Sequence, residues 1–179
     1  FIQEAVKEGG YGLGDIEAIA VSMGPGSYTG LRIGVSAAKG LCYALGLPLI
    51  AVDTLEVLAR KITVAEEDLI IPLIDARRME AYTAIFGHNY IKLRNTEAEI
   101  ITPESFTELA GTAHLIGDGA EKCKEVLQDA RFVYYDDVRF PSAAEMAEVS
   151  FSKSKIGDTV DVAYFEPFYL KDFVAGKKL

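Results

Sequence analysis

Histidine and cysteine are scarce in this sequence, with two of each among 179 residues. Twenty-five residues separate His88 from His114, whereas two histidines that share a metal on one helix face stand four residues apart. We therefore expect no metal site, with His88 in a solvated turn and His114 at a strand end. Cys42 and Cys123 fall in separate halves of the chain, both in apolar, helix-like surroundings. This pattern favours free buried thiols in a reducing compartment over a disulfide.

Long apolar runs and excess positive charge are also missing. No apolar run approaches the roughly 20 residues that cross a bilayer, and no signal-peptide pattern is present, so we expect a cytoplasmic protein. The formal net charge is −9, which argues against non-specific binding of nucleic acid by this chain alone, because such binding depends on Lys and Arg. Work on RNA within a complex, where another subunit supplies the basic surface, stays open.

No catalytic nucleophile with an adjacent base stands out. Ser27 and Thr29 lie in a glycine-rich run, but the sequence places neither histidine beside them. We expect no catalytic residue and no cofactor.

The glycine-rich run itself is the most informative feature: Gly24-Pro25-Gly26-Ser27-Tyr28-Thr29-Gly30-Leu31-Arg32-Ile33-Gly34. It follows an apolar stretch at 19–23 and opens a predicted helix at 31–45. A strand that turns into a helix presents backbone N–H groups to an anion, so Gly24, Gly26, Ser27 and Thr29 are candidate anion- or nucleotide-binding residues. The run is not a P-loop, because Leu31-Arg32 replaces Lys-Ser/Thr. The structural alternative is a tight turn that needs glycine at positive φ.

The predicted helix at 31–45 is rich in small residues. Gly30, Gly34, Ala37, Ala38 and Leu41 fall on neighbouring faces at helical spacing. A glycine inside a helix costs roughly 0.5–1 kcal/mol relative to alanine, which suggests a compensating close contact. That contact is either with the chain's own sheet or with a partner helix.

The order of predicted elements repeats. The first half reads as a helix at 1–7, a strand at 18–23, a helix at 31–45, a strand at 49–52 and a helix at 54–61. The second half reads as strands at 69–75, 80–86 and 90–101, a helix at 103–110, a strand at 114–117, a helix at 120–130, a strand at 132–135 and a helix at 143–155 that Ser142 and Glu145 cap.

Overlaying the halves predicts an α/β protein of two ribonuclease-H-like lobes, residues 1–65 and 66–179, the first lacking its opening three strands. Because Phe1 already reads as part of an amphipathic helix, the sequence is expected to lack its beginning. Residues 161–179 are expected to be an extended segment packed on the lobes, with a frayed cationic end at Lys177 and Lys178.

The chain resembles the bacterial TsaB (YeaZ) family over nearly its whole length. The blocks that carry the resemblance are 24–34 continuing through 38–41, 51–55, 74–77 with 80–82, and 166–170. The resemblance implies the fold of the actin, Hsp70 and sugar-kinase superfamily. It also implies a non-catalytic role in making threonylcarbamoyladenosine at position 37 of tRNA.

The resemblance further implies a partner interface. The helices at 1–7 and 31–45 would pair with a second copy or with the catalytic TsaD subunit, and the TsaE ATPase would join the pair, so that tRNA is reached only through the complex. The expected interface residues are Phe1, Ile2, Val6, Gly30, Gly34, Ala37, Ala38 and Leu41.

The alternative is a self-sufficient nucleotide-dependent enzyme or glycoprotease-like peptidase with its site between the lobes. Asp75, Arg77 and Glu80 would then face the cleft instead of forming a solvated hairpin with an ion pair. This alternative predicts ATP binding by the isolated chain.

Overall fold

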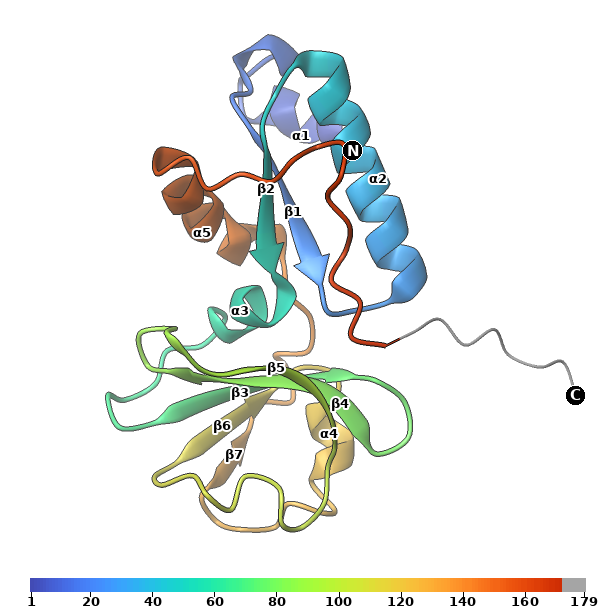
Figure 1. The fold of residues 1–179 in the computed structure, drawn as a ribbon. Helices are drawn as coiled ribbons and strands as arrows, with labels where there is room; N and C mark the ends of the chain where they lie inside the picture. Colours follow the sequence, from blue (N-terminus) through green and yellow to red (C-terminus); the bar gives the residue numbers. More distant parts are fainter. Residues whose placement is uncertain (172–179) are drawn as a thin grey trace, which may run out of the picture.

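A computed structural model describes residues 1–171. The predicted cationic end, Lys177 and Lys178, lies outside the described residues. In Figure 1 a two-stranded sheet lies above a five-stranded sheet. The upper part contains α1 (Ile2–Glu8), the 3-10 helix η1 (Leu13–Asp15), β1 (Ile19–Gly24), α2 (Tyr28–Leu45), β2 (Leu49–Asp53) and α3 (Thr54–Ala59). The elements that follow are β3 (Leu69–Asp75), β4 (Glu80–Gly87), β5 (Lys92–Ile100), β6 (Ala113–Ile116), α4 (Ala120–Cys123), β7 (Phe132–Tyr134) and α5 (Ala143–Lys155).

The two-stranded sheet is covered on both faces. β1 and β2 pair in parallel, with Ile19 opposite Leu49, and α2 connects them. α2 packs on one face, where Ala38 meets Leu49, and α5 packs on the other, where Val149 meets Ile50. Figure 1 shows the two helices on opposite sides of the strands. A sheet this small gains its stability from these two helix contacts.

The five-stranded sheet has the order β5-β4-β3-β6-β7. β3, β4 and β5 form an antiparallel meander, and β6 and β7 run parallel to β3. The strand order along the chain is the one that the sequence predicts for the second lobe, and the α/β class is confirmed.

Residues 103–110 do not form the predicted helix; they form turns. Phe106 has a φ of 65°, which a continuing right-handed helix does not allow. Its ring is 1% exposed and fills the core beside the sheet. Arg131 donates hydrogen bonds to the carbonyl oxygens of Leu109 and Phe106 at 2.5 and 2.8 Å. Burial of the ring and these long-range bonds override the local helix signal at Thr102-Pro103.

The helix predicted over 120–130 is also wrong, because α4 ends at Cys123. Leu127 is 2% exposed under the sheet, and its carbonyl oxygen accepts a hydrogen bond from the Tyr134 hydroxyl at 2.8 Å. The tertiary contact holds this segment in turns.

The last third of the chain returns to the first sheet. Val149 of α5 packs with Ile50 and Val52, and Val160 donates its N–H to the Leu49 carbonyl oxygen at 2.9 Å. The predicted division into 1–65 and 66–179 assigned both segments to the second lobe. The boundary at residue 65 separates the strands of the two sheets. The elements that cover the first sheet, however, come from sequence before and after this boundary.

The α3 helix joins the two sheets. Its buried residues Leu55, Leu58 and Ala59 pack against Ile70, Phe86 and Ile116 of the second sheet. Asp53, the N-cap of α3, also forms an ion pair with Lys92 of β5. We call the part built on the first sheet the first unit and the part built on the second sheet the second unit. Apart from the polar contacts of Asp53, the contacts that α3 makes with the second unit are apolar.

Candidate functional site

The α2 helix has a buried side and an exposed side. Val35, Ala38 and Cys42 face the first sheet and are at most 6% exposed. On the other side Ile33 and Tyr43 are 67% and 88% exposed. Packing within the chain therefore does not explain the apolar character of the outer side.

Two glycines on the outer side have open space around them. A Cβ atom added to Gly34 or Gly40 would meet no atom within 4 Å outside the local helix backbone. The chain's own packing does not need glycine there, although glycine lowers helix stability. We define the α2 face as Gly30, Ile33, Gly34, Ala37, Gly40 and Leu41.

One predicted interface residue on α2 is wrong. Gly30, Gly34 and Ala37 are exposed and Leu41 is half-buried. Ala38 is 6% exposed and packs against the first sheet. Each residue turns the helix by about 100°, so the step from Ala37 to Ala38 moves the side chain from the outer side to the buried side. Ala38 belongs to the core.

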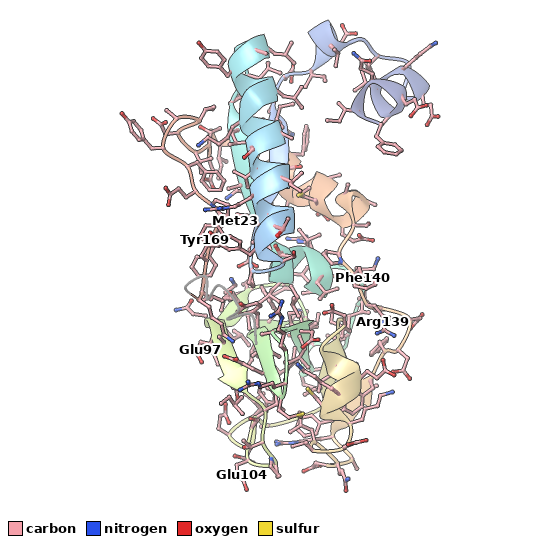
Figure 2. The ribbon with its side chains drawn as sticks, turned by 90° about the vertical axis from the view of Figure 1, so that its right-hand side faces the viewer. Met23, Glu97, Glu104, Arg139, Phe140 and Tyr169 are labelled. Atoms are coloured by element: carbon pink, nitrogen blue, oxygen red, sulfur yellow. The ribbon has the colours of Figure 1, made fainter. Side chains whose placement is uncertain are left out.

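The predicted interface residues of α1 are accessible but lie apart from the α2 face. Phe1 is 104% exposed and Ile2 is 49% exposed, while Val6 is half-buried. Figure 2 shows α1 to the side of the C-terminal half of α2 and separated from it. Within one chain, the structure does not join these residues to Gly30 or Gly34.

The glycine loop between β1 and α2 is closed by the chain itself. Gly24 has a φ of 113°, and a Cβ there would lie 2.8 Å from the carbonyl oxygen of Phe168. Phe168 in turn donates its N–H to the Met23 carbonyl oxygen at 2.7 Å. Gly24 is thus required by a contact with residues near the end of the described chain.

We call residues 160–171 the strap. The strap is bonded to β2 through Val160, and it is also held by α2. Lys39 of α2 donates hydrogen bonds to the carbonyl oxygens of Ala163 and Phe165, at 3.1 and 2.9 Å. The rings of Tyr169 and Tyr28 are in contact, tilted by 39° with centroids 5.0 Å apart. Figure 1 shows the strap in red beside α2, and the labelled Met23 and Tyr169 lie together in Figure 2. The strap therefore lies against the glycine loop.

The remaining loop residues have local roles. Ser27 caps α2, and its Oγ accepts a hydrogen bond from the Gly30 N–H at 3.3 Å. Gly24 alone of the run's glycines has a positive φ; Gly26 and Gly30 do not. The tight turn that the sequence offered as the structural alternative therefore needs this conformational freedom at Gly24. Thr29 is exposed, and an anion at the loop stays a prediction for Gly24, Gly26, Ser27 and Thr29.

A polar cluster that the sequence did not reveal lies where the two units meet. The Thr54 hydroxyl contacts the Ser22 hydroxyl at 2.5 Å and accepts from the Gly24 N–H at 3.1 Å. Asp53 accepts from the ammonium of Lys92, which also donates to Thr96. The block Ala51-Val52-Asp53-Thr54 carries half of this cluster, but the residues it meets come from β1 and β5. Its bonds hold the glycine loop and α3 in place.

The β3–β4 hairpin carries Asp75, Arg77 and Glu80. Asp75 forms an ion pair with Lys122, and Glu80 forms one with Lys171 of the strap. Burial raises the pKa of Asp75, but Lys122 and the Arg77 N–H outweigh it and lower this pKa below its ordinary value. Arg77 is exposed with a φ of 73°. The ion-pair interpretation of the hairpin accounts for both carboxylates.

The histidines and cysteines have structural surroundings. His114 is 9% exposed, and its ring nitrogens contact Asp68 and Tyr135, each at 3.0 Å. Cys42 and Cys123 are buried free thiols, and burial raises the pKa of Cys123 to about 11. Among residues 1–171, no three His, Cys, Asp or Glu side chains are grouped closely enough to hold a metal. In the same residues no helix is long and apolar enough to cross a membrane.

Comparison with known proteins decides the family. The family model described as TsaD, tRNA N6-adenosine threonylcarbamoyltransferase, matches residues 1–173. The chain is 33% identical to the tRNA threonylcarbamoyladenosine biosynthesis protein TsaB of Escherichia coli, over 99% of this chain and 80% of that protein. The chain belongs to the TsaB (YeaZ) family.

In direct comparison with single proteins, the TsaB and YeaZ matches cover more of this chain than the following transferase match does. The solved structure of YeaZ from Pseudomonas aeruginosa is 26% identical with a TM-score of 0.78, covering 94% of this chain and 81% of that one. The tRNA N6-adenosine threonylcarbamoyltransferase of Cereibacter sphaeroides is 48% identical, but over only 30% of this chain and 15% of that protein. The actin-like fold expected from the TsaB resemblance is confirmed.

Proposed function

We propose that this chain is a non-catalytic scaffold in the synthesis of tRNA N6-threonylcarbamoyladenosine, and that it docks through the α2 face on a catalytic TsaD-type subunit. The observation that carries the proposal is the open space around Gly34 and Gly40 on an exposed apolar helix face. Small residues allow a partner helix to approach closely and to pack its ridges into the groove between them.

The rest of the assembly is part of the same proposal. A second copy of the chain would use the α2 face in a homodimer, in competition with the TsaD-type subunit. The exposed Phe1 and Ile2 would extend the contact to a part of the partner that lies beside α2. A TsaE-like ATPase would join the docked pair, tRNA would be contacted through the complex, and the site of action would be the cytoplasm.

The alternative of a self-sufficient nucleotide-dependent enzyme or peptidase is less well supported. The strap lies against the glycine loop and places the Phe168 carbonyl oxygen where a ligand would approach Gly24. A nucleotide at this loop would have to displace that contact. Calorimetric titration of the isolated chain with ATP and ADP separates the two functions, and micromolar binding would favour the enzyme.

Docking is tested with Gly34→Leu in the full chain. The new side chain extends into open space, so the monomer keeps its fold, but the side chain blocks a close helix approach. We expect light scattering and calorimetry to show a complex of the wild-type chain with the TsaD-type subunit, and a loss of at least about tenfold in affinity for the variant.

The matched control is Gly14→Leu. Gly14 lies in η1, where an added Cβ also meets nothing within 4 Å, and the change adds the same bulk far from the α2 face. Equal affinity of both variants and the wild type would reject the α2 face, and the lack of any wild-type complex would reject the scaffold function.

A further inference from the structure

The α2 helix is positively charged within an acidic protein. It contains Arg32 and Lys39 and no acidic residue, whereas the whole chain has a net charge of −9. The two cations are seven residues apart, so they lie two turns apart on one side of the helix. Among the described residues, neither is paired with a carboxylate. Within that part of the chain, no direct ion pair offsets the positive charge on this side of α2.

A groove runs between this side of α2 and the strap, with a volume of about 250 Å³. Its α2 wall carries Arg32, Ser36 and Lys39, and its strap wall carries Phe165, Glu166 and Tyr169. Ser36 is three residues after Ile33 and four residues before Gly40, a spacing that makes them neighbours on a helix surface, so the groove borders the α2 face. A partner on the α2 face would reach this groove.

The geometry leaves both cations able to bind an acceptor. Lys39 is held in place by two neutral carbonyl oxygens of the strap, which use two of its three N–H donors and none of its charge. Arg32 lies over the Tyr28 ring, with its Cζ 4.4 Å from the ring centroid. Stacking uses the face of the guanidinium, whereas its N–H groups point outward in the plane and fit a carboxylate in a bidentate pair.

We propose that this groove receives an acidic side chain of the docking partner, which Arg32 binds directly and Lys39 attracts. The proposal rests on the proposed function, because the groove borders the α2 face. Glu166 on the strap wall carries a negative charge, which would repel the partner's acidic side chain. Removing the charge of Arg32 should therefore weaken the complex, and removing the charge of Glu166 should strengthen it.

The test measures the affinity of the full chain for the TsaD-type subunit at low and at high sodium chloride. Arg32→Gln removes the bidentate contact, and we expect the Kd to rise about tenfold at low salt. The difference should shrink at high salt, because salt screens partly exposed charges. Glu166→Gln should lower the Kd, because it removes the repulsion.

The matched control is Arg139→Gln. Arg139 is half-exposed and pairs with Glu121 on the second unit, so this variant loses the same charge far from α2. Equal Kd values for Arg32→Gln and Arg139→Gln within an intact complex would overturn the groove proposal and leave the scaffold function standing. Absence of a wild-type complex would overturn both.

A small-anion site is the competing outcome. Inorganic phosphate titrated into the free chain is the probe, and we expect no saturable binding. Phosphate binding that disappears in Arg32→Gln, together with an unchanged Kd for the partner, would overturn the proposal in favour of a small anion.

Discussion

The glycine loop and the α2 face both contain glycine, for opposite reasons. At Gly24 the backbone is left-handed and a Cβ would lie 2.8 Å from the Phe168 carbonyl oxygen. At Gly34, ten residues later, the backbone is helical and a Cβ would touch nothing. The first glycine is explained within the folded chain. The second lowers the stability of the monomer, and no contact within the chain requires it. Glycine at such a position is expected where a partner helix must approach closely.

The strongest test of this contrast is Gly24→Ala. The substitution forces a side chain into a positive-φ backbone and against a main-chain oxygen, so we expect a loss of about 3 kcal/mol in the free energy of unfolding. Urea denaturation measures it. Gly26→Ala is the control, because its Cβ would lie 3.9 Å from the nearest atom, and it should change stability by less than about 0.5 kcal/mol. Equal effects at both positions would contradict the special role of Gly24.

A second test asks whether the strap and the loop move together. Lys39→Met removes two charge-assisted hydrogen bonds to the strap, and we expect amide hydrogen exchange of Phe168 to accelerate about tenfold. Exchange within β6 should not change, because that strand lies in the other sheet.

The control for the strap is Lys153→Met, which removes an ion pair with Asp158 outside the strap. If Lys39→Met accelerates exchange only near Ala163 and leaves Phe168 protected, then the strap does not hold the loop as one unit.

The smallest expected effect is at Gly34, and its sign is reversed. Gly34→Ala should raise the free energy of unfolding by about 0.5–1 kcal/mol, because alanine favours the helix and meets no obstacle. The same urea measurement checks it, and Gly40→Ala should behave alike. A loss of stability at Gly34 would mean that the chain itself uses this glycine.

Local patterns predicted most of the strands and α2 from the sequence. The apolar run ending in Asp75 and the glycine run before α2 have short-range signals that the structure keeps. The two failures, at 103–110 and 120–130, occur where a buried side chain and a distant donor decide the backbone. Phe106 turns left-handed to place its ring in the core, and Arg131, far along the sequence, takes the freed carbonyl oxygens.

The site was predictable in outline but not in detail. Helical spacing identified Gly30, Gly34 and Ala37 as one group, yet spacing alone could not tell that Ala38 faces the sheet. The partner of Gly24 lies at Phe168, more than a hundred residues away, and no local signal connects them. Spacing within α2 places Arg32 and Lys39 on one side, but the wall opposite them comes from the strap.

The return of α5 and the strap to the first sheet has a consequence for how the chain folds as it is made. The second sheet is built from one continuous stretch, β3 to β7, so its contacts can form as soon as that stretch has left the ribosome. The first sheet is synthesised earlier, and α2 can cover one of its faces at once, yet Ile50 on the other face obtains its covering residue only when Val149 emerges. We expect the first sheet to be completed last, with the face that α5 covers left open in the interval.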